Sequence, residues 1–262
     1  YEVFEPGEGL LACGWVGKGR LPEPEDLFHS IDTFFSSSED KPLKGKRVLI
    51  TAGPTQEPID PVRYLTNYST GKMGYALAKA AKRLGAHVTL ISGPTHLPHP
   101  QVDAFIPVHT TNDMYEAVHA RFEAVDAVIK TAAVADFRPK SVATQKVKKD
   151  KMAGNWSIEL EANPDILKSL GERKTHQILV GFAAETEQIE THARAKIEKK
   201  QADIIVANDV SQEGAGFASD SNEVTLYYKT GEVDKISMRS KDEVAIVICQ
   251  ALARLFTLRD QK

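Results

Sequence analysis

The segment ITAGPTQEPIDPVRYLTNYSTGKMGYALA, residues 50–78, limits the possible folds of this chain more than any other. An apolar stretch over 47–51 predicts a buried strand. A Gly-Pro pair and a long polar loop follow it, and a helix then begins at a Ser-Thr-Gly-Lys sequence. Helix N-termini expose unpaired N–H groups and the positive end of the helix dipole, so they bind anions. Because α/β proteins place phosphates at such strand–loop–helix junctions, the segment predicts a nucleotide or phosphate-ester site.

The bulk composition is that of an ordinary globular protein, since 42% of the 262 residues are hydrophobic and 26% are charged. A formal net charge of −3 argues against general nucleic-acid binding, which needs a basic face. Two cysteines, Cys13 and Cys249, suit a reducing compartment and are too few for a cysteine-only zinc site. No apolar run reaches transmembrane length. We therefore expect a cytoplasmic enzyme or binding protein with neither nucleic-acid nor membrane partners.

Residues 1–45 differ from the rest of the chain in composition. They are rich in glycine and proline and contain a Ser-Ser-Ser tract, and only 26–35 carries a helical pattern of apolar residues. This composition predicts a tail and linker rather than a core. Because the chain opens at Tyr1 without a Met, we expect a piece of a longer protein. The predicted organisation is a tail over 1–45 and one domain over 46–262.

From Lys46 onward, predicted strands and helices alternate. Strands are predicted over 47–51, 86–92, 104–110, 126–134, 178–185 and 202–210, helices over 74–84, 112–124, 163–170, 186–200 and 241–258, and a β-hairpin over 223–240. Near-continuous apolar strands separated by helices indicate a parallel sheet covered on both faces. The predicted fold is α/β, a Rossmann-like three-layer sandwich with a mostly parallel sheet and a C-terminal β-hairpin extension.

Ligands of such sheets bind at the carboxyl ends of the strands, which here are 51–55, 93–95 and 132–138. The predicted helix N-caps are Ser69 or Thr70, Thr111 or Asn112, and Asn163, which precedes Pro164.

The sequence NYSTGKMG, residues 67–74, is the best phosphate candidate. Its hydroxyl side chains can cap the helix, and Gly71 lets the backbone approach an oxyanion. The spacing is not that of a Walker A loop. A capped helix with Lys72 in solvent explains the same residues equally well.

Three further side chains near these strand ends are candidates. Arg63 suits a bidentate phosphate or carboxylate contact, and Asn67 can donate to a carbonyl oxygen. From spacing alone, a salt bridge and a turn residue are the favoured explanations of these two. Asp136 can hold a ribose hydroxyl or a metal-bound phosphate, whereas Arg138 fits a surface ion pair.

Two groups of lysines could face a phosphate. The tract QKVKKDK, residues 145–151, is a candidate lid that neutralises phosphate charge, although such tracts are more often solvated charge runs. Lys196 and Lys200 lie one turn apart near the end of a predicted helix, where they can face a triphosphate or simply the helix dipole.

Seven segments, in order along the chain, are similar to one family. They are TAGPTQEPIDPVR, NYSTGKMGYALA, TAAVADFRP, KVKK, NPDIL, VGFAAET and IVANDV, the last with GFASDSNEV after it. Over roughly residues 44–258 the chain resembles phosphopantothenoylcysteine synthetase, the ligase half of the bifunctional bacterial coenzyme A biosynthesis flavoprotein. Residues 10–27 resemble the end of the partner half, the flavin-dependent decarboxylase domain, with Cys13 as its proton-donating cysteine. Without the rest of that half, we expect neither bound FMN nor decarboxylase activity.

The resemblance implies a homodimeric ligase that joins 4′-phosphopantothenate to cysteine. It implies CTP as a substrate and Mg²⁺ as a cofactor, an acyl-cytidylate intermediate, and release of pyrophosphate and CMP. Asn67 would hold the acyl carbonyl, Arg63 would contact phosphopantothenate, also across a dimer interface, and Lys146 would stabilise the reacting phosphate. The implied nucleotide site is Ser69, Gly71, Ala132, Ala133, Ala135, Asp136, Phe137, Lys146, Pro164, Asp165, Ile166, Leu167, Phe182, Lys196 and Lys200, with Asp136 also near the metal. Family members commonly carry Ser-Ser-Gly where this chain has Ser-Thr-Gly, and threonine keeps the hydroxyl.

Two other classes of protein stay open. Tyr75 and Lys79 match the Tyr-x3-Lys pair of short-chain dehydrogenases, but they lie on the first helix and the glycine turn of that family is absent. A non-catalytic module would bind a nucleotide without turnover, and Asn67 and Lys146 argue against it. The sequence also leaves CTP and ATP open, because main-chain contacts would read the base.

Overall fold

The computed structural model describes residues 6–10, 13–28, 31, 41–148, 155–185, 187–209 and 219–260. The chain separates into two compact units, residues 1–41 and residues 42–262. The first unit contains the antiparallel pair β1 (Gly7–Leu10) and β2 (Val16–Arg20), followed by a helical segment over 24–28. Most of the remainder of the helix predicted over 26–35 lies outside the described residues.

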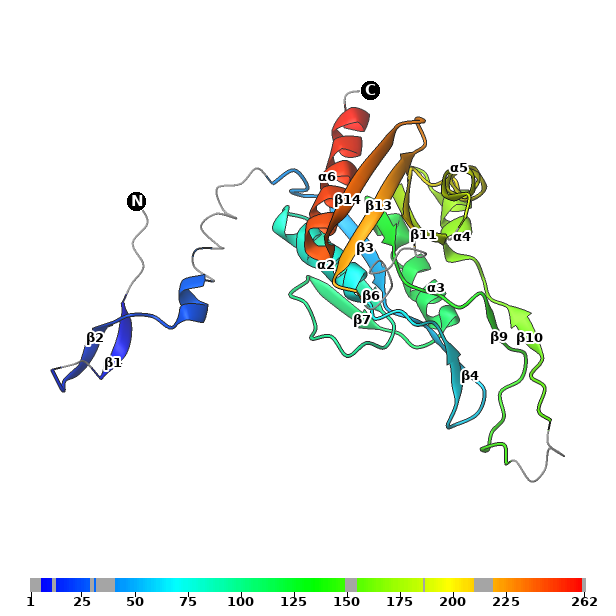
Figure 1. Ribbon diagram of the computed structural model, residues 1–262, viewed down its shortest axis with the longest axis horizontal. Helices are drawn as coiled ribbons and strands as arrows, with labels where there is room; N and C mark the ends of the chain where they lie inside the picture. Colours follow the sequence, from blue (N-terminus) through cyan, green and yellow to red (C-terminus); the bar gives the residue numbers. More distant parts are fainter. Residues whose placement is uncertain are drawn as a thin grey trace. The chain divides into compact units, whose positions relative to one another are not determined.

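An eight-stranded sheet forms the centre of the second unit (Figure 1). Its strands are β3 (Arg47–Ala52), β6 (His87–Ser92), β7 (Ala104–Pro107), β8 (Ala127–Lys130), β11 (Ile178–Glu185), β12 (Ile204–Asp209), β13 (Ser221–Tyr228) and β14 (Val233–Ser240). They lie in the order β14-β13-β12-β11-β8-β3-β6-β7. The strands from β12 to β7 pair in parallel, and the antiparallel hairpin β13–β14 extends the sheet beyond β12. The predicted mostly parallel sheet with a C-terminal hairpin is confirmed.

Helices cover both faces of this sheet. Helices α2 (Lys72–Arg83) and α6 (Lys241–Asp260) pack in one apolar core, and α3 (Thr111–His119), α4 (Ile166–Arg173) and α5 (Ile189–Lys200) pack in the other. Successive residues of a strand point to opposite faces. In β3, Val48 and Ile50 accordingly join the first core and Leu49 the second, and all three are fully buried. The predicted three-layer sandwich is therefore confirmed.

The predicted helix caps are wrong. Gly71 is the N-cap of α2, in a left-handed conformation with φ 80°, and no side chain caps that helix. Thr110 caps α3 in a capping box with Asp113, and Asp165 caps α4. Each cap lies one or two positions after or before the predicted residues, because the local turn geometry decides which residue precedes the first helical turn.

Several predicted element ends also differ. Strand β8 stops at Lys130, so residues 131–134 form a loop instead of continuing the strand predicted to 134. Helix α3 stops at His119, and a separate 3₁₀ turn, η1 (Phe122–Ala124), follows where one helix was predicted. Strand β7 is shorter than predicted, and α5 begins at Ile189 rather than 186.

Two small antiparallel pairs grow out of the long loops. They are β4 (Gln56–Pro58) with β5 (Tyr64–Thr66), and β9 (Phe137–Pro139) with β10 (Leu160–Ala162). Figure 1 places β4, β9 and β10 beyond one end of the sheet, away from the C-terminal end of α6. Within the described ranges, no helix is both long enough and apolar enough to span a membrane.

Candidate functional site

The loops that follow β3 and β8 lie side by side at the carboxyl edge of the sheet. Pro54 and Ala133 form an isolated parallel bridge. The Ala133 amide donates to the Gly53 carbonyl at 3.0 Å, and the Thr55 amide donates to the Ala133 carbonyl at 3.3 Å. Gly93 is adjacent as well, because a Cβ there would lie 1.8 Å from the Pro54 carbonyl oxygen. The three strand ends marked out by the sequence therefore meet.

A cavity of about 230 Å³, the α4–α5 cavity, contains most of the predicted nucleotide residues. Its lining is Lys130, Val134, Ala135, Asp136, Asn163, Pro164, Asp165, Ile166, Leu167, Phe182, Lys196 and Lys200. These residues come from β8 and the loop after it, from α4 and the segment before it, and from β11 and α5. The fold thus gathers separate segments of the chain into one concave site at the carboxyl edge.

A smaller cavity of about 90 Å³, the α2 cavity, lies at the start of α2. Its lining is Gly53, Ser69, Thr70, Gly71, Lys72, Met73, Gly74, Thr131, Phe182, Ala183, Asn208, Asn222 and Lys241. Phe182 of β11 lines both cavities, so the predicted phosphate loop and the predicted nucleotide residues adjoin at this side chain.

The start of α2 is packed directly against β3. A Cβ on Gly74 would lie 2.5 Å from the Ala52 Cβ, so the helix backbone touches the end of the strand. The Ser69 hydroxyl accepts from the Gly71 amide at 3.3 Å instead of capping α2. An uncapped first turn that lines a cavity suits an anionic ligand.

The α2 cavity also carries cationic and amide side chains. Lys72 Nζ pairs with Asp220 Oδ1 at 2.6 Å, so Lys72 has a carboxylate partner beside the cavity. Lys241 is buried and donates to the Ser219 carbonyl, and burial together with the nearby Lys72 lowers the pKa of Lys241. The Oδ1 atom of Asn222 is buried, and no described residue gives it a hydrogen bond.

Asn67 lies against the loop after β8. Its Nδ2 donates to the Ala133 carbonyl oxygen at 2.9 Å. The neighbouring Thr66 hydroxyl donates to the Thr55 carbonyl at 2.7 Å, which holds this stretch beside the loop after β3. Asn67, which the resemblance assigns to the acyl carbonyl, is therefore in direct contact with Ala133 of the implied nucleotide site, although neither residue lines the two cavities.

Arg63 is the centre of a second cluster. Its guanidinium forms an ion pair with the buried carboxylate of Asp60 and donates to the Val147 carbonyl at 2.9 Å. The Val147 amide donates to Asp60 at 3.1 Å, and the Trp156 ring lies 4.4 Å from the Arg63 guanidinium carbon. The hydrogen bond from Arg63, with the amides around it, holds the pKa of Asp60 well below its usual range.

The cluster anchors the basic tract. Val147 follows Lys146 directly, so the Asp60–Arg63 pair fixes the backbone beside that lysine. Lys149 and Lys151 lie outside the described residues. The salt-bridge explanation of Arg63 is the arrangement that the structure contains.

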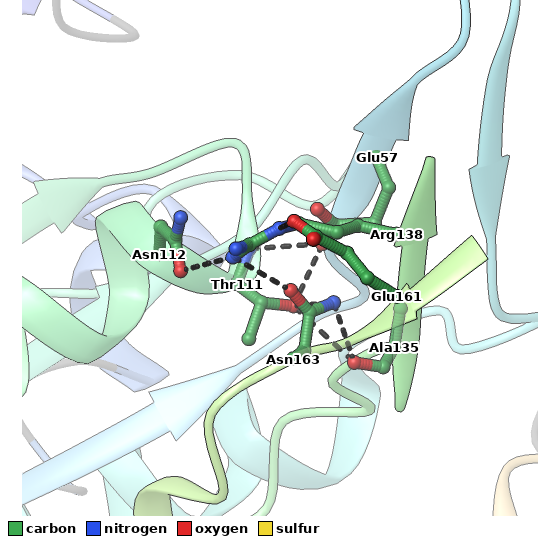
Figure 2. Close-up of polar contacts among 7 residues, drawn as sticks. All are labelled: Glu57, Thr111, Asn112, Ala135, Arg138, Glu161 and Asn163. Atoms are coloured by element: carbon green, nitrogen blue, oxygen red, sulfur yellow. Dashed lines mark hydrogen bonds and ion pairs between the residues drawn. The ribbon is translucent and has the colours of Figure 1, made fainter. Parts of the chain in front are cut away.

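Figure 2 shows a polar network that includes the Ala135 carbonyl. The Glu57 carboxylate, which is 1% exposed, accepts from the Thr111 amide at 2.9 Å and the Thr111 hydroxyl at 2.7 Å. Asn163 Nδ2 donates to the Ala135 carbonyl at 2.9 Å and to the Thr111 hydroxyl oxygen at 3.2 Å. The carboxylate lies at the N-terminus of α3, where the helix dipole favours negative charge.

Arg138 joins this network through Asn163. Its guanidinium donates to Glu161 at 2.8 Å, to Asn112 at 2.8 Å and to Asn163 at 3.3 Å. Asn163 therefore orients the main chain of Ala135 rather than capping α4. The predicted ion pair of Arg138 is present, and it supports the strand β9.

Charges in the α4–α5 cavity are unevenly paired. Lys200 forms an ion pair with Asp165, which also accepts from the Lys168 amide at 3.0 Å. Burial opposes ionisation of Asp165, but these two contacts outweigh it and lower the pKa of its carboxyl. Lys130 and Lys196 face the same cavity.

The described side chains of this cavity could bind a metal ion only together with ligands from a bound molecule. In the described part of the chain, no group of three or more His, Cys, Asp or Glu side chains could hold a metal ion. Asp136 lines the cavity, whereas Asp165 is engaged by Lys200. Mg²⁺ commonly binds through one or two carboxylates plus substrate phosphates. One carboxylate at this position fits a Mg²⁺ ion that arrives with a nucleotide.

Comparison with known proteins identifies the domain. The model of the family described as "DNA/pantothenate metabolism flavoprotein C-terminal domain" matches residues 43–255. The chain belongs to this family. The resemblance to phosphopantothenoylcysteine synthetase, the C-terminal half of the bifunctional flavoprotein, is thereby confirmed at the level of the family.

Relatives of this flavoprotein C-terminal domain are similar over almost the whole chain. The coenzyme A biosynthesis bifunctional protein CoaBC of Bacillus subtilis (strain 168) is 54% identical over 256 residues, which are 97% of this chain and 63% of the relative. The protein of the same name from Escherichia coli (strain K12) is 44% identical over 88% of this chain and 57% of its own length. The chain thus spans less than two thirds of these curated relatives.

Solved structures share the fold. The crystal structure of the C-terminal domain of a CoaBC protein is 47% identical, with a TM-score of 0.72 over 83% of this chain and 98% of that one. A Cab2 variant in complex with phosphopantothenate-cysteine is 16% identical, with a TM-score of 0.66 over 92% of this chain and 97% of that one. The second likeness concerns the fold alone.

Several residues of this flavoprotein domain escaped prediction. Glu57, Lys130, Asn163, Asn222 and Lys241 all line or support the two cavities. For Lys130 a signal existed, because a lysine that ends a strongly apolar strand is unusual in a buried sheet. Asn222 and Lys241 come from β13 and α6, and only the sheet topology brings them to the start of α2.

Proposed function

We propose that this domain is a phosphopantothenate–cysteine ligase of coenzyme A biosynthesis. It uses CTP to activate 4′-phosphopantothenate as an acyl-cytidylate and then joins the acyl group to cysteine. One observation carries the proposal: the α4–α5 cavity gathers, at the carboxyl edge of the sheet, most of the residues that the resemblance assigns to the nucleotide. The names of the relatives, which refer to coenzyme A biosynthesis, support the same pathway.

The nucleoside occupies the α4–α5 cavity in this proposal. The main chain of Ala135 and Phe137 reads the base, and the Glu57–Thr111–Asn163 network keeps that main chain in place. The triphosphate begins in the α4–α5 cavity and extends past Phe182 to the α2 cavity, because the start of α2 is uncapped there and offers N–H groups and a positive dipole end. Mg²⁺ would bind Asp136 and phosphate oxygens, and it would neutralise charge on the reacting phosphate.

The chemistry follows in two displacement steps. A carboxylate oxygen of phosphopantothenate attacks the α-phosphorus, the bond to the bridging oxygen breaks, and pyrophosphate leaves. The cysteine nitrogen then attacks the acyl carbon, the bond to the nucleotide oxygen breaks, CMP leaves, and the nitrogen loses a proton. Asn67 holds the acyl carbonyl, and Lys146 stabilises the reacting phosphate.

Arg63 contacts phosphopantothenate across the interface of a homodimer in this proposal. Apolar side chains next to Arg63 are exposed on the β4–β5 turn, with Val62 at 59% and Tyr64 at 51%, as expected of an interface. Residues 1–45 are the tail of a preceding decarboxylase domain and a linker, and the ligase domain spans 46–262. The fusion operates in the cytoplasm, and this chain binds no FMN.

A pyrophosphate-release assay tests the function. The chain is incubated with phosphopantothenate, cysteine and Mg²⁺, and with CTP or ATP. We expect CTP-dependent pyrophosphate release that requires phosphopantothenate, with cysteine needed for turnover. Nucleotide binding without pyrophosphate release would point to a non-catalytic module instead. Oxidation of NADPH without pyrophosphate release would point to a dehydrogenase.

A further inference from the structure

Lys130 lines the α4–α5 cavity. It is the last residue of β8, the strand between β3 and β11 near the middle of the sheet. Its ammonium donates to the Ala132 carbonyl at 3.0 Å, and among the described residues it has no carboxylate within ion-pair distance. An ammonium has three N–H donors, so two remain for a ligand in the cavity.

The charges around Lys130 favour an anion. Lys196 and Lys200 face it from α5, Asp165 faces it from the N-cap of α4, and Asp136 faces it from the loop after β8. Asp165 is already paired with Lys200. Three ammonium groups therefore share two carboxylates, and one of these is engaged. Burial and the neighbouring Lys196 lower the pKa of Lys130 to about 8.

We propose that Lys130 is an additional nucleotide-binding residue that contacts a phosphate oxygen of the bound nucleotide. The proposal rests on the proposed function, since it needs a nucleotide in the α4–α5 cavity. A phosphate fits better than the base or the ribose, because leaving a partly buried ammonium without an anion is costly and a phosphate supplies both charge and acceptors. No sequence motif identifies Lys130 as a binding residue, whereas its position in the cavity does.

A protonation effect follows from this contact. A phosphate beside Lys130 favours the charged amine and so raises the pKa of that amine. Because part of the population is neutral in the free protein near pH 8, binding at pH 8.5 takes up a proton. Nucleotide affinity should therefore fall as the pH rises above about 8.

The test is calorimetric titration with cytidine, CMP and CTP, at pH 7 and at pH 8.5 in two buffers of different ionisation enthalpy. The proteins are the wild type, Lys130→Met and Lys130→Arg. Lys168→Met serves as the matched control, because Lys168 is an exposed residue of α4 whose partner is Glu172. The two Met variants each lack one positive charge of the domain, whereas the wild type and Lys130→Arg keep it.

We expect Lys130→Met to bind CMP and CTP at least ~10-fold more weakly, as loss of a charge-assisted hydrogen bond predicts. Cytidine affinity should change less than about 2-fold, since the nucleoside has no phosphate. Proton uptake at pH 8.5 should be present in the wild type and Lys168→Met, and absent in both Lys130 variants. Lys130→Arg should keep most of the CTP affinity, because arginine stays charged.

An equal loss of cytidine and CTP affinity in Lys130→Met would overturn the phosphate contact and indicate a structural role. Unchanged CTP affinity in Lys130→Met would also overturn the phosphate contact. Nucleotide binding by the wild type without proton uptake at pH 8.5 would overturn it as well, and that measurement does not depend on the folding of a variant. A wild type that binds neither CTP nor ATP would instead count against the proposed function itself.

Discussion

The guanidinium of Arg63 donates to the carbonyl oxygen of Val147 at 2.9 Å, across 84 positions of the chain. Asp60 completes this contact, because its carboxylate accepts from Arg63 and from the Val147 amide. The residue proposed to bind phosphopantothenate is therefore tied to the backbone beside Lys146, which is proposed to act on the phosphate. A substitution at Arg63 or Asp60 is therefore expected to affect the position of Lys146 as well.

Replacing Asp60 by Asn should destabilise the protein and lower ligase activity. The amide cannot form the ion pair with Arg63, and the Val147 backbone loses a charged acceptor. We expect a lower urea midpoint than in the wild type and a larger loss than in Asp103→Asn, whose half-exposed carboxylate pairs with Lys82 at the surface. Equal midpoints for the two variants would contradict the anchoring role.

The contribution of the Asp60 carboxylate to stability should be lost at acid pH. The folded-state pKa of Asp60 lies below the unfolded value of about 3.9, so its contribution to stability is complete above that pH and is lost as the pH falls toward the folded pKa. Urea midpoints measured between pH 6 and pH 2.5 should fall more steeply in the wild type than in Asp60→Asn. Parallel curves would show that Asp60 carries no such linkage.

Asn67→Asp should slow the second chemical step. The Asn67 Nδ2 atom now donates to the Ala133 carbonyl oxygen at 2.9 Å, and a carboxylate there would repel both that oxygen and the acyl oxygen of the intermediate. Loss of such a donor typically costs ~10²–10³-fold in rate. Acyl-cytidylate should accumulate in quenched reactions analysed by mass spectrometry. Normal product formation by this variant would contradict the role of Asn67.

Thr111→Val should weaken both the fold and nucleotide binding. The hydroxyl of Thr111 is fully buried, donates to Glu57 and accepts from Asn163, so its removal leaves buried polar groups unpaired. The expected cost is about 1–3 kcal/mol in the free energy of unfolding. The KM for the nucleotide should rise as well, because Asn163 holds the Ala135 carbonyl.

The control for that variant is Thr225→Val, a partly buried threonine of β13 outside the network. It should unfold close to the wild-type midpoint and keep the wild-type KM. If Thr111→Val lost stability but kept the KM, the network would support the fold without positioning the base-reading main chain.

Gly74→Ala should destabilise the junction of α2 and β3. The added Cβ would lie 2.5 Å from the Ala52 Cβ and 3.2 Å from the Thr51 carbonyl oxygen, so the helix must move away from the strand. Overpacking of this kind costs about 1–3 kcal/mol. Lys79→Ala, at an exposed position of the same helix, should change the thermal midpoint little. A wild-type midpoint for Gly74→Ala would mean that the junction is not rigid.

The sequence alone determined the layer architecture. Near-continuous apolar strands such as β3 and β11 are buried on both faces, and that pattern is local, so it can be read without tertiary contacts. The Ser-Thr-Gly-Lys sequence, residues 69–72, likewise predicted where α2 begins to within a few residues. The ordered motifs pointed to the family that the comparisons confirm.

Tertiary structure alone decided which polar residues act together. The sequence offered Asn163 as a helix cap, but the fold places it against Ala135 and Thr111, and Asp165 caps α4 instead. Lys130 of β8 and Lys196 of α5 line one cavity only because the fold brings these two segments together. Hydrogen bonds and charge interactions depend on distances of a few ångströms between segments far apart in the chain, and the pairing of strands, not the order of residues, sets those distances.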